Sequence, residues 1–203
     1  LVLTAGSGGV LVHAATLVQD GGVTAYKNGS ARVRLAAGTP GNATVAASIG
    51  GQSLATGQRA PSVGSYRLVT AGSALVLAAS VNGTPLDAPA LTLKAGADYT
   101  LLVHGDPAAA QAALLADDNR LPATGNAKIR LVNALANLEG GLTLNVNYSA
   151  LAIEVAPGAA SDPVALAQVS DVPLEVISPL SAQPLYAIAE ADLLSRGVYT
   201  VFM

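Results

Sequence analysis

A short internal repeat constrains the fold of this chain more than any other feature. The segment ARVRL (31–35) recurs as AKIRL (127–131), and DYTLLV (98–103) recurs as VYTVFM (198–203). In both copies a strand that alternates basic and apolar residues comes first, and a Tyr-Thr strand comes near the end. The repeat predicts two diverged copies of one β domain of about ninety residues, a size typical of a small β-sandwich.

Both copies consist of short apolar or alternating runs separated by turn residues. Runs spaced about ten residues apart favour an antiparallel β-sandwich over alternating strands and helices. Asn28-Gly29 and Asn82-Gly83 are hairpin signals, because Asn and Gly both tolerate positive φ. The segment DPAAAQAALLADDN (106–119) leaves two possibilities open, a helical turn favoured by its alanines or the closing strand of the first copy. We therefore expect an all-β chain of two tandem immunoglobulin-like antiparallel β-sandwich domains.

The domain boundaries follow from the repeat and from residues that break regular structure. Pro122 and Gly125 interrupt the segment RLPATGNA, which therefore reads as a linker between the two copies. The residues before the first copy are apolar and strand-like. We expect a strand-forming arm, a first sandwich, a linker and a second sandwich, at residues 1–27, 28–120, 121–126 and 127–203.

The charge content excludes several classes of function. Charged residues make up only 11% of the chain, against about 25% in a usual soluble domain. The net charge is −3 and the basic residues are scattered, so no nucleic-acid partner is expected. There are no cysteines, which excludes disulfides, thiolate metal sites and cysteine nucleophiles. No apolar run is long and uninterrupted enough for a membrane span. A surface with so few charges suits a subunit that is covered by its neighbours.

Three segments together resemble a known family: ARVRL, DYTLLVHG and LLADDNRLPATGNAKIRLVNA. They are similar to the bacterial family of domains of unknown function numbered 4397, over about residues 28–203. Its most specific parts are Asp117–Asn119 and Arg130–Ala134. The resemblance implies tandem β-sandwich domains in an exported or cell-envelope protein, often a lipoprotein, although this sequence lacks the lipidated cysteine. The family has no established activity. We expect a location at the cell surface, in the periplasm or outside a bacterium.

Candidate catalytic residues are sparse. His13 and His104 are the only imidazoles, and neither accompanies a nucleophile motif. The glycines of LVLTAGSGGVL are typical of a phosphate-binding loop, but the position of the third glycine falls on Leu11 and no helical pattern follows. We therefore expect no enzyme and no cofactor.

Two weaker sites remain as hypotheses. Asp117, Asp118 and Asn119 offer hard oxygen ligands for calcium, although a competent site needs six to eight oxygens from several segments. A loop that satisfies its own backbone amides is the alternative, and we expect no resident metal. Isolated tyrosines, of which Tyr148 is one, could serve as platforms for a glycan or protein ligand.

The arm is the strongest candidate for function. Its apolar strands need a partner, because exposed strand edges invite aggregation. They could pair in cis, as a hairpin added to the first sandwich, or in trans, as a strand donated to a neighbouring copy. The residues expected to form the assembly strand are apolar: Leu1, Val2, Leu3, Val10, Leu11, Val12, Leu17 and Val18.

The sequence thus favours a non-enzymatic structural subunit that assembles into a filament or surface layer by donation of an N-terminal strand, with other copies of itself as partners. The alternative is a monomeric surface or periplasmic binding or adhesion module. That module would recognise a glycan or protein near Tyr148 or the Asp117–Asn119 loop.

Overall fold

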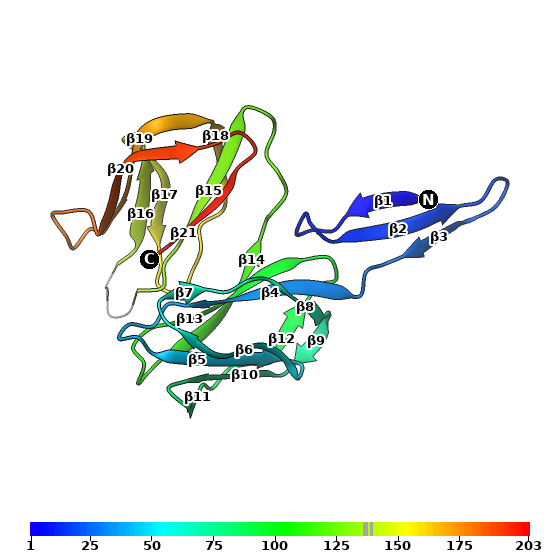
Figure 1. Ribbon diagram of the computed structural model, residues 1–203, viewed down its shortest axis with the longest axis horizontal. Helices are drawn as coiled ribbons and strands as arrows, with labels where there is room; N and C mark the ends of the chain where they lie inside the picture. The colour runs from blue at the N-terminus through cyan, green and yellow to red at the C-terminus, as the bar shows by residue number, and fades with distance from the viewer. Residues whose placement is uncertain (136–137, 139) are drawn as a thin grey trace. The chain divides into compact units, whose positions relative to one another are not determined.

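The computed structural model describes residues 1–135, 138 and 140–203. Every regular element in this part of the chain is a β-strand, which confirms the predicted all-β class. No helix suited to crossing a membrane occurs in these residues. The chain divides into two compact units (Figure 1): unit 1 contains Leu1–Val103 and Pro107–Arg120, and unit 2 contains His104–Asp106 and Leu121–Met203.

A five-stranded sheet forms one side of unit 1. Its strands follow the order β14-β13-β4-β7, and β8 pairs with β4 on the same side as β7. The strands are β4 (Ser30–Ala37), β7 (Ser62–Val63), β8 (Arg67–Thr70), β13 (Asp98–His104) and β14 (Gln111–Asp117). The segment 106–119 therefore supplies a closing strand, because β14 occupies the place that an alanine-rich helical turn could have taken.

The second side of unit 1 is a four-stranded sheet in the order β11-β10-β5-β6, accompanied by the pair β12-β9. These strands are β5 (Thr44–Ile49), β6 (Gln52–Arg59), β9 (Gly72–Leu75), β10 (Leu77–Val81), β11 (Thr84–Pro85) and β12 (Leu91–Leu93). Alternate residues of both sides meet in one apolar core, with Val33, Leu35, Ile49 and Leu101 almost completely buried. Period-two alternation along each strand is what places these side chains on one face.

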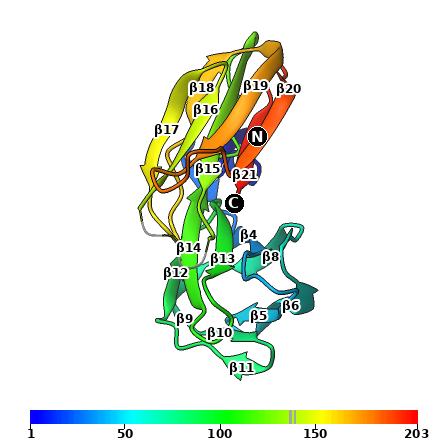
Figure 2. The same ribbon diagram turned by 90° about the vertical axis from the view of Figure 1, so that its left-hand side faces the viewer.

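Unit 2 repeats this plan with fewer strands (Figure 2). One sheet has the order β18-β15-β21 and the other β17-β16-β19-β20. The strands are β15 (Asn126–Val132), β16 (Leu142–Val146), β17 (Ser149–Val155), β18 (Val164–Ala167), β19 (Val169–Ile177), β20 (Tyr186–Leu193) and β21 (Val198–Phe202). Ile129, Leu131, Leu144 and Val176 lie in its core.

The two segments that repeat in the sequence are hydrogen-bonded neighbours in each unit. Strand β4 pairs with β13, and β15 pairs with β21, in the same register: Arg34 lies opposite Thr100, and Arg130 lies opposite Thr200. Both pairs are parallel, which corrects the expectation of purely antiparallel pairing. A parallel neighbour requires a long crossover connection. Here the intervening strands supply that connection, because the Tyr-Thr strand returns only after the opposite sheet has been built.

The tyrosine of each Tyr-Thr strand accepts a hydrogen bond from the turn before it. The backbone amide of Lys94 donates to the Tyr99 hydroxyl at 3.1 Å, and that of Leu194 donates to the Tyr199 hydroxyl at 2.9 Å. Such a bond to the backbone a few residues upstream is also the chemistry of the tyrosine corner in β-sandwiches. The two copies therefore share side-chain contacts as well as strand order.

One of the two predicted hairpin signals is confirmed. Asn82 and Gly83 have φ values of 50° and 82° and connect β10 to β11. The hairpin prediction at Asn28-Gly29 is wrong, because the strands on either side of it belong to different sheets. The side chain of Asn28 instead accepts a hydrogen bond from the amide of Ser30 and thereby fixes the start of β4.

Candidate functional site

The N-terminal residues form a sheet of their own, here called the N-terminal sheet. It contains β1 (Val2–Ala5), β2 (Val12–Leu17) and β3 (Val23–Tyr26), all antiparallel in the order β1-β2-β3. Among the described strands it pairs with no other sheet. The cis alternative, a hairpin added to the first sandwich, is therefore not the one observed, because β1, β2 and β3 pair with one another.

The N-terminal sheet is apolar and exposed. No residue of β1, β2 or β3 is buried. Leu1 is 83% exposed, and Leu17 and Val23 are each 66% exposed. Of the eight residues predicted for the assembly strand, Leu11 is half-buried and the other seven are exposed. Val10, Leu11 and Val18 lie in the connections and not in the strands.

A glycine loop (residues 6–9) between β1 and β2 joins this sheet to the rest of unit 1. The amide of Gly8 donates to the carbonyl of Gly96 at 3.0 Å, and the amide of Asn119 donates to the carbonyl of Gly8 at 3.0 Å. A Cβ on Gly8 would overlap Asp98, and one on Gly6 would overlap the backbone of Gly96. The glycines are required by this close backbone approach, and the loop is an anchor instead of a phosphate cradle.

His13 takes part in the same anchor. Its Nδ1 accepts a hydrogen bond from the amide of Asn28 at 3.0 Å, just before β4 begins. The ring also lies beside Gly96, which has a φ of 78°. His13 thus connects β2 to the start of the five-stranded sheet, and this structural contact occupies one of its two ring nitrogens.

Next to the anchor lies an ion pair on the outer face of the five-stranded sheet. Arg32 donates to both carboxylate oxygens of Asp98, with Nε–Oδ1 at 2.8 Å and Nη2–Oδ2 at 2.6 Å. Asp98 is fully buried, and the Asn119 side chain donates to its Oδ2 at 2.7 Å. Paired, bidentate hydrogen bonds are what offset the cost of burying a carboxylate. Hydrogen bonding to Asp98 also raises the pKa of Arg32.

Tyr66 is the centre of this polar group, here called the Tyr66 cluster. Its ring lies under both guanidinium groups, with Arg32 Cζ 4.5 Å and Arg34 Cζ 4.8 Å from the ring centroid. Its hydroxyl donates to Asp117 Oδ2, which also accepts from the Thr100 hydroxyl at 2.7 Å. Burial raises the pKa of Tyr66 to about 12. The cluster ties β4, β13 and β14 to the start of β8.

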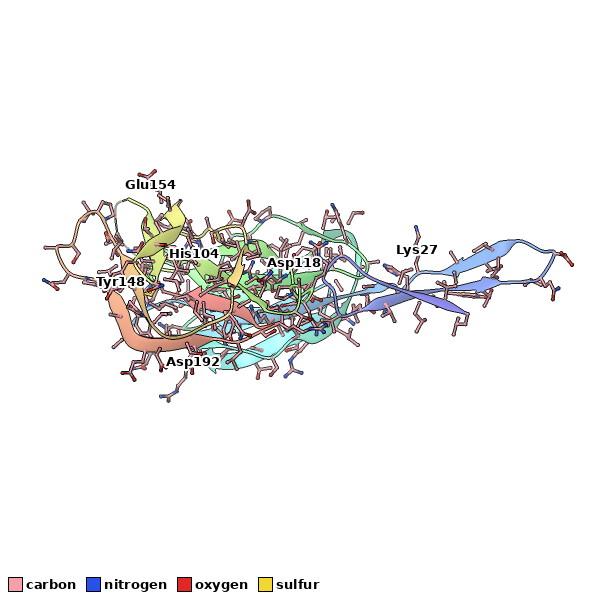
Figure 3. All side chains as sticks on the ribbon, turned by 90° about the horizontal axis from the view of Figure 1, so that it is seen from above. Lys27, His104, Asp118, Tyr148, Glu154 and Asp192 are labelled. Atoms are coloured by element: carbon pink, nitrogen blue, oxygen red, sulfur yellow. The ribbon has the colours of Figure 1, made fainter. Side chains whose placement is uncertain are left out.

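The Asp117–Asn119 segment does not present its side chains as one ligand set. Asp117 faces Tyr66 and Thr100, while Asp118 (Figure 3) forms an exposed ion pair with Arg120 at 2.8 Å. Asn119 directs its amide nitrogen, which cannot bind a cation, at Asp98. Within the described residues, no group of three or more histidines and carboxylates gathers as a metal site. The arrangement fits an internal polar cluster better than a calcium site.

The remaining sequence-predicted residues lie apart from this cluster. His104 is buried at the end of β13, and this burial lowers its pKa. Tyr148 (Figure 3) lies at the turn between β16 and β17 and is 85% exposed. Asn147 and Tyr148 have φ values of 47° and 61°, as a two-residue hairpin turn requires.

Sequence reasoning missed Tyr66, because the isolated tyrosine stands in an unremarkable Gly-Ser-Tyr context. A signal was present in its partners: Arg32 and Arg34 alternate on one strand, and Asp98 and Thr100 alternate on another. Matching polar alternation on two strands that pair indicates a shared polar face. The sequence alone did not show that those two strands pair.

These observations define an all-β protein with an anchored, exposed apolar sheet and a buried polar cluster behind the anchor. The family described as "Domain of unknown function (DUF4397)" matches residues 31–139, more than half of the chain, and the chain belongs to this family. The match confirms the family resemblance, although it ends before residue 203, and it begins after the N-terminal sheet. A search of curated proteins finds no match.

Proposed function

We propose that this chain is a non-enzymatic structural protein of the bacterial cell envelope or extracellular space. In this proposal two tandem immunoglobulin-like β-sandwich domains form the body of a subunit. Copies of the subunit join into a filament or surface layer through the N-terminal sheet, which acts as the assembly arm by strand donation.

The observation that carries the proposal is the exposed apolar N-terminal sheet. Large contiguous apolar patches are uncommon on monomeric soluble proteins and mark interaction surfaces. Both β1 and β3 also present an outer edge that no described strand covers. Free edges of this kind pair readily with another chain through backbone hydrogen bonds.

The glycine loop attaches the exposed N-terminal sheet at one end. The hydrogen bonds of Gly8 to Gly96 and Asn119 hold one end of the sheet against the rest of unit 1. Because the glycine loop already holds the N-terminal sheet in place, the sheet loses less conformational freedom on binding than a flexible tail would. A contact between such an arm and a different surface of the next copy is heterologous, and repetition of such a contact produces an open polymer unless the rotation closes a ring.

Deletion of the N-terminal sheet tests the proposal directly. We expect the full chain to form large species by light scattering, visible as fibres or sheets by electron microscopy, and the chain lacking residues 1–26 to remain monomeric. The reason is that the deletion removes the apolar strands and their free edges while β4 and the core remain. A full chain that stays monomeric at high concentration would contradict the proposal and favour the binding module, for which exposed Tyr148 is the first residue to examine.

A further inference from the structure

The strand at one edge of the five-stranded sheet is interrupted. Strands β7 and β8 both pair with β4, at Ala36–Ala37 and at Ser30–Val33 respectively. Residues 64–66 between them lie outside both strands, although the amide of Gly64 still donates to the carbonyl of Leu35 at 2.8 Å. Tyr66 enters the cluster on the outer face with Arg32 and Arg34. Gly64 and Ser65 instead border a pocket toward the core. The interruption at residues 64–66 therefore places Tyr66 on the outer face of the sheet and leaves a pocket on the core-facing side.

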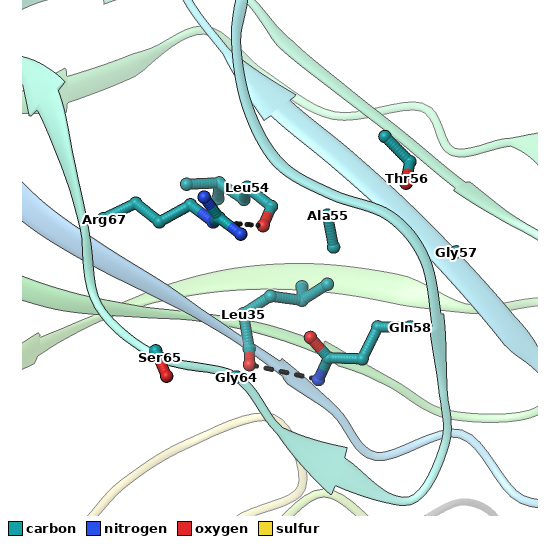
Figure 4. Close-up of a pocket in the computed structure, with 9 residues that line it drawn as sticks. All are labelled: Leu35, Leu54, Ala55, Thr56, Gly57, Gln58, Gly64, Ser65 and Arg67. Carbon is teal, nitrogen blue, oxygen red and sulfur yellow. Dashed lines mark hydrogen bonds between the residues drawn. The ribbon is translucent and has the colours of Figure 1, made fainter.

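This opening, here called the edge pocket, has a volume of about 290 Å³ (Figure 4). Leu35 and Leu54, both core residues, contribute to its lining. Two hydrogen bonds bridge its sides: Arg67 Nε donates to the Leu54 carbonyl at 3.0 Å, and Gln58 Nε2 donates to the Leu35 carbonyl at 3.4 Å. A water molecule occupies about 30 Å³ in the liquid, so the pocket has room for aliphatic side chains.

A free strand edge borders the edge pocket. Strand β6 is the last strand of the order β11-β10-β5-β6, so its outer edge has no partner among the described strands. Ala55, Thr56 and Gly57 of β6 line the pocket. These small residues permit another backbone to approach closely. The site therefore combines a backbone edge for pairing with a hollow for side chains, the two components of strand addition. The hollow has a mixed lining, with Leu35, Leu54 and Ala55 beside the polar Thr56, Gln58 and Ser65.

We propose that the edge pocket and the free edge of β6 accept strand β1 of a second copy, with Leu3 and Leu1 entering the pocket. This inference rests on the proposed function and names its acceptor. Leu1 directly precedes β1, and in an extended donated strand that includes it Leu1 and Leu3 share a face, because side chains alternate along a strand. Residues 1–18 contain no charged side chain, and the one charged lining residue of the pocket, Arg67, donates to Leu54. The donated strand therefore brings no charged side chain of its own into the contact.

The occupant comes from another copy because of where the anchor lies. Gly96 and Asn119 hold the glycine loop next to β13 and β14, whereas the edge pocket lies beside β7 and β8. The strand order β14-β13-β4-β7 puts these at opposite edges of one sheet. The glycine loop of the same copy is thus held across the sheet from its own edge pocket, and a contact made by another copy joins the copies head to tail.

The absence of cysteine allows a direct test by cross-linking. We would mix the full-length Leu3→Cys and Ser65→Cys variants, both at exposed positions, and oxidise them under assembly conditions. We expect a disulfide-linked heterodimer at least about tenfold above the amount from Leu3→Cys mixed with Ser149→Cys, because docking raises the local thiol concentration. Ser149 is also an exposed serine and lies in unit 2.

The outcomes separate the acceptor from the proposed function. The full chain can form large assemblies that are lost on deletion of residues 1–26, while the Ser65→Cys and Ser149→Cys mixtures cross-link equally. That result would overturn the acceptor assignment and leave the proposed assembly function intact. If the unsubstituted chain stays monomeric, both are overturned. As a second variant, Ser65→Trp at the mouth of the pocket should abolish assembly while leaving the thermal unfolding of unit 1 unchanged. Normal assembly by this variant would overturn the acceptor assignment.

Discussion

Tyr66 shows how one side chain can organise a polar face. Its ring lies under two guanidinium groups and its hydroxyl donates to a buried carboxylate, so the ring and the hydroxyl both have partners. Buried charges are tolerated only when they are paired and hydrogen-bonded in this way. The residues of the Tyr66 cluster therefore stabilise unit 1 by supplying one another with hydrogen-bond and ion-pair partners. Removing one of these partners should measurably lower the free energy of unfolding.

We expect Tyr66→Phe to lower the free energy of unfolding of unit 1 by about 1 kcal/mol, because Asp117 loses one of its hydrogen-bond donors while the ring stays in place. Urea denaturation followed by circular dichroism would measure the change. Tyr26→Phe is the matched control, since Tyr26 is 56% exposed and should leave stability unaltered. Equal stability of Tyr66→Phe and the unsubstituted chain would show that the hydroxyl contributes nothing.

The same hydroxyl makes stability fall in alkaline solution. The pKa of Tyr66 is raised from 10.0 to about 12, mainly by burial. Between these values the unfolded chain has released the proton and the folded chain retains it, so stability decreases as the pH rises through this range. We expect the gap in stability between the unsubstituted chain and Tyr66→Phe to shrink above pH 10. Urea titrations at a series of pH values would measure it, and a constant gap would contradict this pKa.

At the scale of elements, the glycine loop determines whether the N-terminal sheet is anchored. Its backbone is hydrogen-bonded to Gly96 and Asn119, and Asp98 leaves no space for a Cβ at Gly8. Three strands without a buried face form a marginal sheet in water. Its order therefore depends on the anchor more than on its own packing.

We expect Gly8→Ala to release the N-terminal sheet, with a loss of about 1–3 kcal/mol in the local opening free energy from the overlap with Asp98. Hydrogen exchange of residues 1–26 should become faster, while exchange in β5 and β10 stays slow. Gly22→Ala is the control, because a Cβ there meets no atom within 4 Å. Unchanged exchange in the Gly8→Ala variant would show that the loop does not hold the sheet.

At the scale of the whole molecule, the apolar surface should govern association. We expect Leu17→Lys to raise the concentration required for assembly by about tenfold or more, because it places a charge in a contact that excludes water. Light scattering across a concentration series measures this. Ile153→Lys in unit 2 is matched in exposure, 67% against 66% for Leu17, and should assemble normally. Equal effects of the two variants would indicate general solubility instead of a specific interface.

The sequence by itself determined the local features of this protein. Alternation in ARVRL and DYTLLV predicted strands, and their recurrence in AKIRL and VYTVFM predicted two related copies. The uncharged segment at residues 1–18 indicated strand-forming residues without a core. These properties depend on side-chain period and composition, which act between near neighbours in the chain.

Only the tertiary structure decided which strands meet. The parallel pairing of β4 with β13, the Tyr66 cluster that it supports, and the self-pairing of β1, β2 and β3 all join segments whose partners local pattern does not specify. The Asn28-Gly29 prediction failed for the same reason: a turn signal is local, whereas the sheet that each flanking strand enters is chosen by pairing and packing across the whole unit.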